Sequence, residues 1–222
     1  MSCFKDFVII LLNMRLSHIG IEGPPKSGKR ILAEALAKEL SGLPVLDNDY
    51  NPYLKDFYKG KEDVVLLTQL VFLINRYNQQ MEILQRKLFH EIVICDYIFE
   101  KDKIYAYQTL SDSELSIYNK LFDILYPKIP KPDLVVYLQL SDEVLIRRMR
   151  KRGNPWEKSA SEEYLKGLNE AFNYFFFHYK LSPLLIINCD ELDFESEGWS
   201  IGTIKEKIFE TRAGTNIYVP RK

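Results

Sequence analysis

The chain has few cysteines, little net charge and no long hydrophobic run, and each shortage excludes a class of protein. Its three cysteines lie far apart without a Cys-x-x-Cys spacing, which argues against a disulfide framework or a zinc site. A net charge of −1 gives the chain no general attraction for nucleic acid or a membrane surface. The apolar run at residues 7–12 is too short to cross a bilayer. We therefore expect a cytoplasmic protein with no nucleic-acid or membrane partner.

The length and apolar content fit one globular domain. The chain has 222 residues, 46% of them hydrophobic, which is enough for the core of a single α/β domain. No internal repeat or low-complexity segment divides it. Met14 stands just before the first predicted strand, so we expect residues 1–13 to be a dispensable extension and residues 14–222 to form the domain.

The most informative stretch covers residues 18–30 and reads HIGIEGPPKSGKR. An apolar run ending at Glu22 predicts a strand, and the following ILAEALAKEL predicts a helix. The glycine and lysine spacing between them fits a P-loop, in which backbone amides surround a polyphosphate and the lysine reaches its outer phosphates. A plain tight turn is the alternative. The predicted phosphate-binding residues are Gly23, Pro24, Pro25, Lys26, Ser27, Gly28, Lys29 and Arg30.

Short β-branched runs alternate with helical segments along the rest of the chain. Strands are predicted at residues 43–47, 91–96, 131–140 and 183–188. This alternation predicts an α/β fold, a P-loop-type parallel sheet with helices on both faces and ligands at the carboxyl ends of the strands. Asp96 ends one of these strands, so we expect its carboxylate in the site; a cap of the next helix is the alternative.

Residues 62–88 predict one long helix, because apolar side chains recur near the helical period. Gln69, Arg76 and Gln80 interrupt that pattern and are seven and four residues apart, which aligns them on one face. Such a polar stripe is either a solvated face or one wall of a binding site.

A basic segment and an aromatic stripe follow. Five of the six residues at 147–152 are Lys or Arg, and a glycine-containing loop comes next. In a P-loop protein we expect this segment to be a mobile lid that clamps phosphates, with a solvated surface as the alternative. The predicted helix at 161–179 carries aromatic side chains along one side, which is typical of a core or a subunit interface.

The order of these motifs resembles the deoxynucleoside kinase family, most closely its bacterial deoxyadenosine and deoxyguanosine kinase branch. The matching stretches span residues 16–194 and are EGPPKSGKR, Tyr58 before the helix with Gln69 and Arg76, CDYIFEKDKIYA, PDLVVYLQ, RRMRKRGNPWE and NCDELDF. The resemblance implies transfer of the γ-phosphoryl group of ATP, as its Mg²⁺ complex, to the 5′-hydroxyl of a deoxyribonucleoside. It also implies a homodimer.

On the donor side, the resemblance assigns roles to single residues. Lys29 would bind the outer phosphates and Asp96 would be the general base. Glu22 matches a second acidic position near substrate and metal, and Mg²⁺ would be held by Glu22 and Asp96, through water. The donor site would be completed by two lid arginines and a loop that holds the adenine, at Arg148, Arg152, Asp193 and Phe194.

On the acceptor side, Gln69, Arg76 and Asp102 fall where the family reads the edge of the base. An amide side chain suits that task because it both donates and accepts hydrogen bonds in a fixed plane. Tyr105 matches an aromatic residue that packs against the base. The residues that would hold the sugar 3′-hydroxyl are Tyr58 and Glu157.

Two positions depart from the family pattern. Arg30 replaces the hydroxyl that binds Mg²⁺, and we expect its side chain to turn away or to lie on a donor phosphate. Tyr97 stands where many members have an arginine, which removes one cation. Two other functions stay open. One is a nucleoside monophosphate kinase of the thymidylate kinase type, and the other is a catalytically impaired, regulatory nucleotide-binding protein.

Overall fold

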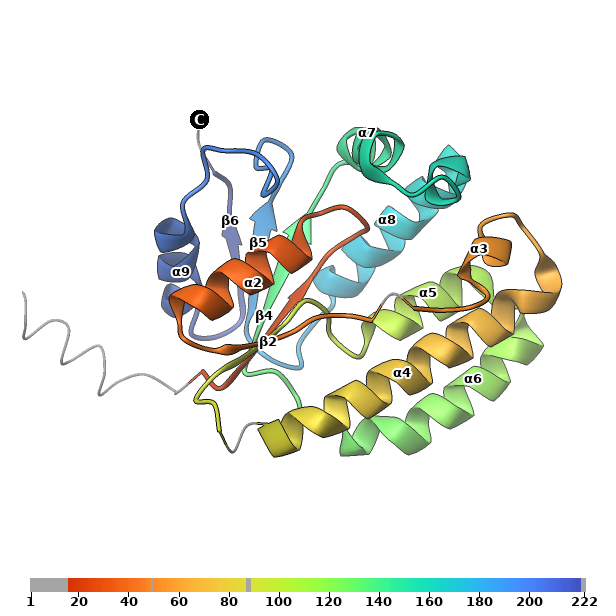
Figure 1. Cartoon of the computed structure of the whole chain (residues 1–222), viewed down its shortest axis with the longest axis horizontal. Coiled ribbons are helices and arrows are strands. Elements are labelled where there is room, and N and C mark those ends of the chain that lie inside the picture. The colour runs from red at the N-terminus through yellow and green to blue at the C-terminus, as the bar shows by residue number, and fades with distance from the viewer. Residues whose placement is uncertain (1–15, 49, 87–88, 221–222) are drawn as a thin grey trace, which may run out of the picture.

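The chain folds around a parallel sheet, in a computed structural model that describes residues 16–48, 50–86 and 89–220 (Figure 1). Within those residues the strands lie in the order β2-β3-β1-β4-β5-β6, and every neighbouring pair is parallel. The predicted P-loop-type sheet is confirmed; the predicted extension at residues 1–13 lies outside the described part. The strands are β1 (His18–Glu22), β2 (Leu43–Val45), β3 (Val93–Cys95), β4 (Leu134–Gln139), β5 (Leu184–Asn188) and β6 (Thr215–Tyr218).

Helices cover both faces of the sheet (Figure 1). One apolar core joins the sheet to α2, α7 and α9, and a second joins β4 to α5 and α8. The long helix α4 packs on the β2 and β3 edge and also against α6. The helices are α2 (Lys29–Glu39), α3 (Leu54–Phe57), α4 (Val65–Arg86), α5 (Lys101–Thr109), α6 (Asp112–Leu125), α7 (Asp142–Arg152), α8 (Glu162–Phe177) and α9 (Ile201–Glu210), with short 3₁₀ turns at Glu62–Val64, Tyr126–Lys128 and Glu157–Ser159.

The strands are continuous apolar runs because helices bury both of their faces. All five residues of β1 are buried, and so are the first five residues of β4. Neighbouring residues of β4 enter different cores: Val136 packs on the α2 side, whereas the ring of Tyr137 stacks on Phe176 of α8 with centroids 4.1 Å apart. Two-sided burial therefore fixes the sheet between its helical layers.

Helix α4 buries its polar stripe and exposes part of its apolar side. Gln69, Arg76 and Gln80 are at most 5% exposed. Leu67 and Ile74, in contrast, are 42% and 39% exposed. The polar stripe is therefore not a solvated face, and α4 presents it to the interior beside the carboxyl ends of the strands.

The carboxyl ends of β1, β2 and β3 meet at one edge of the sheet. The connection after β1 leads toward β2, whereas the connection after β3 leads to β4 on the other side of β1. Such a reversal opens a crevice beyond the strand ends, where α/β proteins bind their ligands. The P-loop after β1, Asp47 after β2 and Asp96 after β3 all border it.

Candidate functional site

The P-loop borders a cavity of about 350 Å³. The loop turns sharply at Gly28, where φ is +98° and a Cβ would lie 2.8 Å from the Phe194 ring, so only glycine fits without strain. Lys29 donates a hydrogen bond to the Gly23 carbonyl at 2.6 Å. The residues that line this donor-side cavity are Lys26, Ser27, Gly28, Lys29, Arg30, Ile31, Asp47, Asp96, Lys101, Glu157 and Glu195.

Glu22 lies beneath the P-loop rather than in the cavity wall. Its side chain is fully buried, and its two carboxylate oxygens accept hydrogen bonds from the amides of Gly23 at 2.9 Å and Ile98 at 3.2 Å. It also lies 3.5 Å from the Lys29 ammonium. Burial lowers the pKa of Lys29, and the negative charge of Glu22 opposes that shift. Glu22 thus fixes the loop and the lysine, and the structure does not bring it to the cavity where a direct catalytic role was predicted.

Asp96 lies in the cavity wall, as predicted. Its Oδ1 accepts a hydrogen bond from the Asp47 amide at 2.5 Å, and its Oδ2 lies 3.7 Å from Arg30 Nε. Arg30 also donates to the Asp47 carbonyl at 3.0 Å. Burial raises the pKa of Asp96. Helix α5 begins only at Lys101, so Asp96 does not cap it.

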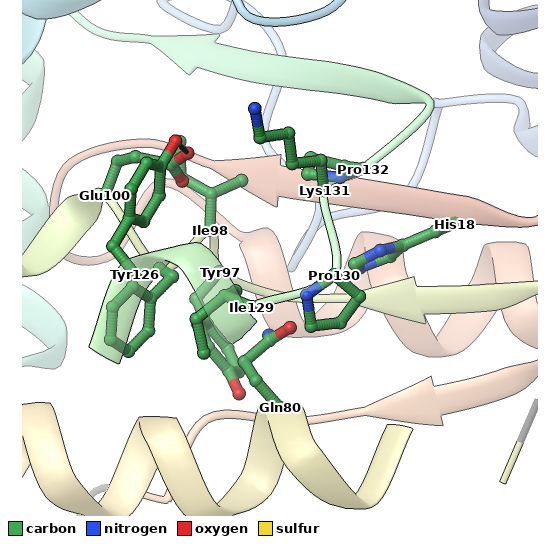
Figure 2. A pocket seen from close by; sticks show the side chains of 11 residues that line it. His18, Gln80, Tyr97, Ile98, Glu100, Tyr126, Ile129, Pro130, Lys131 and Pro132 are labelled. Carbon is green, nitrogen blue, oxygen red and sulfur yellow. Dashed lines mark hydrogen bonds between the residues drawn. The ribbon is translucent and has the colours of Figure 1, made fainter. Parts of the chain in front are cut away.

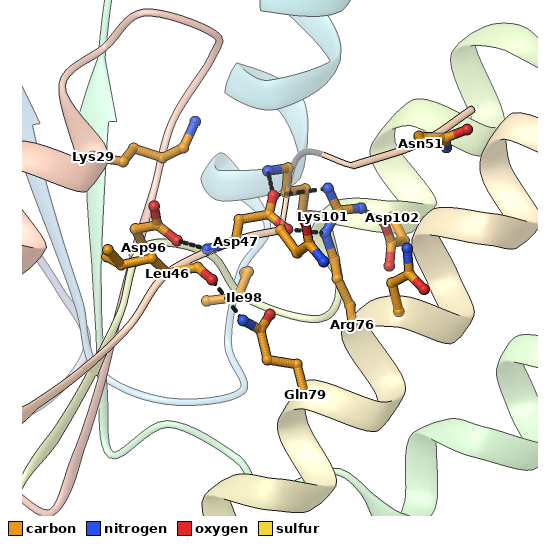
Figure 3. A network of polar contacts seen from close by, with 12 residues as sticks. Lys29, Leu46, Asp47, Asn51, Arg76, Gln79, Asp96, Ile98, Lys101 and Asp102 are labelled. Carbon is orange, nitrogen blue, oxygen red and sulfur yellow. Dashed lines mark hydrogen bonds and ion pairs between the residues drawn. The ribbon is translucent and has the colours of Figure 1, made fainter. Parts of the chain in front are cut away.

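The centre of the site is a carboxylate that the sequence analysis missed. Asp47 accepts hydrogen bonds from Arg76 Nε at 2.9 Å, Arg76 Nη2 at 2.8 Å and Lys101 Nζ at 2.8 Å (Figure 3). Burial alone would raise the pKa of Asp47, but Arg76 and Lys101 hold it well below its usual range. One signal could have found it. Like Asp96, it follows an apolar run that ends at a strand's carboxyl end.

Helix α4 also fixes the segment that carries Asp47. Gln79 donates a hydrogen bond to the Leu46 carbonyl at 2.5 Å (Figure 3), and Asn51 donates one to the Thr68 carbonyl at 2.9 Å. These contacts tie the polar turn after β2 to the inward face of α4. The turn after β2 is therefore part of the site.

A second cavity, of about 380 Å³, lies between α4, α5 and the turn after α7. Aromatic rings from several segments line it, and an amide and a guanidinium from α4 give it polar edges. Such a lining suits a flat ligand with hydrogen-bonding groups. The predicted nucleoside-binding residues that line this acceptor-side cavity are Tyr58, Gln69, Arg76, Tyr105 and Glu157, beside the aromatic residues Phe57, Phe72, Trp156 and Tyr164.

Asp102, the sixth predicted nucleoside-binding residue, lies behind Arg76. It is 1% exposed and accepts a hydrogen bond from Arg76 Nη1. Burial raises the pKa of Asp102 to about 6, and the positive charge of Arg76 opposes that shift. Asp102 does not line the acceptor-side cavity and acts on any ligand there only by orienting Arg76.

The two cavities share a wall. Lys26, Asp47, Lys101 and Glu157 line both of them. Lys26 of the P-loop and Glu157 of the turn after α7 form an ion pair at 3.0 Å across this boundary. A group bound in one cavity can therefore approach a group bound in the other.

Arg148, predicted to clamp phosphates, binds backbone instead. It is buried and donates hydrogen bonds to the carbonyls of Cys189 at 2.8 Å and Leu192 at 2.9 Å. It also reaches the carbonyls of Lys26 and Ser27, both at 3.4 Å. Arg148 does not line either cavity, and it joins α7 to the P-loop and to the segment after β5.

Arg152 and the segment after β5 form a second link. Arg152 donates to Asp193 Oδ1 at 3.0 Å and lies 3.0 Å from Glu195 Oε2. The hydrogen bond from Arg152 lowers the pKa of Asp193. Phe194 is buried against Gly28. The two lid arginines thus brace the region predicted to hold the donor adenine, and Glu195 of that segment lines the donor-side cavity.

The carboxylates at the donor-side cavity can be compared with the needs of Mg²⁺, which binds through one or two carboxylates, phosphate oxygens and water. Among the described residues no three His, Cys, Asp or Glu side chains cluster as metal ligands. Asp96 fits this mode, because it lines the cavity and its Oδ2 accepts no hydrogen bond from the described part of the chain. Glu22 fits poorly, since it is fully buried and does not line the cavity. Of the two carboxylates predicted to hold Mg²⁺, the structure thus places only Asp96 at the cavity.

Comparisons with known proteins agree with this architecture. A family model described as "Deoxynucleoside kinase" matches residues 19–212. The deoxyguanosine kinase of Bacillus subtilis is 35% identical over 153 residues, which cover 68% of this chain and 73% of that protein. A deoxyadenosine/deoxycytidine kinase of the same organism is 28% identical over 200 residues, 86% of this chain and 91% of that protein.

Solved structures show the same fold. The structure of deoxyadenosine kinase from M. mycoides with bound dATP superimposes with a TM-score of 0.72 and 24% identity, and covers 86% of this chain and 98% of that one. In the described part of this chain, no helix has the length and apolar character to span a membrane.

The ion pairs around Arg76 predict a large loss of stability on its removal. Arg76→Met should lower the free energy of unfolding by about 3–5 kcal/mol, because Asp47 and Asp102 would keep buried charges without their main partner. Urea denaturation measures the loss. The control is Arg86→Met on the same helix, where an exposed pair with Glu82 should contribute at most about 1 kcal/mol. Equal losses in both variants would contradict this account of the network.

Proposed function

The chain belongs to the deoxynucleoside kinase family and phosphorylates nucleosides, and we propose that it transfers the γ-phosphoryl group of ATP to the 5′-hydroxyl of a deoxyribonucleoside. The observation that carries this proposal is the pair of adjoining cavities with a common wall. One has the loop amides and lysine that suit a triphosphate, and the other has the rings and polar groups that suit a nucleoside.

On the donor side, the phosphates of ATP would lie on the P-loop amides, with Lys29 turned from the Gly23 carbonyl onto the outer phosphates. Mg²⁺ would be held by Asp96, through water, and would neutralise charge on the phosphates. Arg30 borders the same cavity, and its Nε lies 3.7 Å from Asp96 Oδ2, so its guanidinium would have to turn from Asp96 onto a phosphate for Mg²⁺ to bind there. Its guanidinium can donate hydrogen bonds to a phosphate oxygen but cannot be a metal ligand.

On the acceptor side, the charge balance favours a neutral substrate. Each cation that lines this cavity already has a carboxylate partner: Lys26 pairs with Glu157, while Arg76 and Lys101 pair with Asp47. A nucleoside monophosphate would require free cations for its phosphate, as in a kinase of the thymidylate kinase type. A nucleoside carries no such charge, and a deoxyribonucleoside is therefore the proposed acceptor.

Two carboxylates could take the proton of the 5′-hydroxyl. The sequence nominates Asp96, and its raised pKa makes it the stronger proton acceptor. Asp47 borders both cavities, whereas Asp96 borders only the donor side. Reach comes before basicity in the choice of a general base, although Arg76 and Lys101 make Asp47 the weaker proton acceptor of the two. We therefore assign proton acceptance to Asp47 and metal binding to Asp96, with the reverse assignment as the alternative.

The surface supports a homodimer, and the buried thiols support the cytoplasm as its compartment. An apolar cavity of about 720 Å³ lies between α5 and α8, near the exposed rings of Tyr107 and Tyr174. A second copy of the chain would bury this face. Cys95 and Cys189 are buried and form no disulfide within the described residues, as expected in a reducing compartment. Sedimentation of the full chain should give the mass of a dimer; a monomer at micromolar concentration would contradict the homodimer.

A nucleoside panel tests the proposed function together with the role of Gln69. ADP release in the presence of ATP should depend on one or more of the four deoxyribonucleosides. Gln69→Ala should lower kcat/KM for the preferred nucleoside, which corresponds to a loss of about 1–3 kcal/mol of transition-state stabilisation, because polar groups of the base would lose a buried partner. The KM for ATP should hardly change. No nucleoside-dependent ADP release in the parent would favour the impaired, regulatory protein, and an unchanged preference in Gln69→Ala would remove Gln69 from the base site.

Paired substitutions separate the two carboxylates. Asp47→Asn should lower kcat by about 10²–10⁴ at any Mg²⁺ concentration, because it removes the proton acceptor. Asp96→Asn should instead raise the Mg²⁺ concentration needed for half-maximal rate and recover part of its activity at high Mg²⁺. Titration of the rate against Mg²⁺ for both variants measures the difference. A loss in Asp96→Asn that no Mg²⁺ restores, beside an active Asp47→Asn, would return the base to Asp96.

A further inference from the structure

Lys101 is a buried lysine at the boundary of the two cavities. It is 7% exposed and is the first residue of α5. Both facts are unusual for a lysine, because burial removes water from the ammonium and the start of a helix repels positive charge. Burial alone would lower the pKa of Lys101, but the charge of Asp47 raises it, so the side chain is a cation.

The ammonium of Lys101 has spare hydrogen-bonding capacity. Its one hydrogen bond to another described residue is the contact with Asp47 Oδ2 at 2.8 Å, whereas an ammonium can donate three. Asp47 already accepts two hydrogen bonds from Arg76, so its negative charge has a partner even without Lys101. Lys101 therefore brings a second cation to this carboxylate and leaves donors for groups inside the cavities.

The location of Lys101 matches the place of transfer. It lines the donor-side and the acceptor-side cavities, as Asp47 does. The other two residues on that boundary, Lys26 and Glu157, come from the P-loop and from the turn after α7. Lys101 instead stands on a helix packed in the core, which holds its charge in one place.

Tyr97 cannot supply this charge. Its fully buried ring lies on the α4 side of the sheet next to Gln80, and both line a small cavity of about 10 Å³ away from the P-loop (Figure 2). Tyr97 thus contributes neither a positive charge nor a side chain to the donor-side cavity. Lys101, four residues later in the chain, lines that cavity and carries a positive charge.

We propose that Lys101 is a positioning residue for phosphoryl transfer, which holds the Asp47 carboxylate toward the acceptor and places a fixed positive charge where the two cavities meet. This proposal rests on the proposed function. In the reaction, the γ-phosphorus forms a bond to the 5′-oxygen as its bond to the β,γ-bridging oxygen breaks. The hydroxyl proton passes to the carboxylate and ADP leaves with the bond's electron pair. The ammonium offsets the negative charge on the moving group.

Substitutions at Lys101 separate this role from a purely structural ion pair. Lys101→Met keeps the length of the side chain and removes its charge, so kcat should fall about 10²-fold or more. The KM values for ATP and nucleoside should change less than about threefold, since neither substrate depends on Lys101 for binding. Lys101→Arg keeps the charge and should recover at least a tenth of the parent kcat.

The matched control is Lys103→Met on the same helix. Lys103 pairs with Asp123 on the α6 side, and its loss should leave kcat unchanged. Thermal unfolding of every variant shows whether it is folded. If Lys101→Met does not fold, Lys101→Gln decides, because it retains a hydrogen-bond donor to Asp47 without the charge.

The outcomes distinguish this proposal from the function on which it rests. A parent protein without nucleoside-dependent ADP release overturns the function and the role of Lys101 with it. An active parent whose folded Lys101→Met or Lys101→Gln variant keeps the parent kcat overturns only the role of Lys101. A higher KM at unchanged kcat in these variants also overturns only the role of Lys101, because Lys101 would then be a simple binding contact.

Discussion

The buried ion pairs around Asp47 are the constraint on which the site depends. A charge buried away from water is tolerated only when it has a well-placed partner. Asp47 is paired with both Arg76 and Lys101, so the three segments that carry these residues must meet at one point. The segment after β2 brings the carboxylate, α4 brings Arg76 and α5 brings Lys101. This requirement explains why α4 turns its polar stripe inward and leaves leucine and isoleucine side chains at the surface.

The same network divides the site into two chemical environments. On the donor side, Lys29 and Arg30 border the space above the P-loop and favour a polyanion. On the acceptor side, each lining cation is paired with a carboxylate, and six aromatic residues form part of the wall. A single boundary therefore separates a region suited to charge from a region suited to a flat neutral molecule. Asp47 and Lys101 stand on that boundary.

Sequence patterns predicted the features that local spacing encodes. The P-loop, the parallel sheet and the shared helix face of Gln69 and Arg76 follow from strand ends and helical period, and the structure contains them. Asp47 and Lys101 were missed, because a carboxylate in a polar turn and a lysine at a helix start resemble surface residues until tertiary packing buries them. Glu22 shows the converse: a strand-end carboxylate can face backbone amides instead of a cavity.

The four backbone contacts of Arg148 change how closure of the site can be understood. They attach α7 to the P-loop and to the segment after β5, so α7 can move as a flap only by breaking these hydrogen bonds or by carrying those segments with it. The turn that follows Gly153 carries Trp156 and Glu157 to the acceptor side. The Lys26–Glu157 ion pair ties this turn to the P-loop as well, so a ligand that enters either cavity acts on a contact that both cavities share.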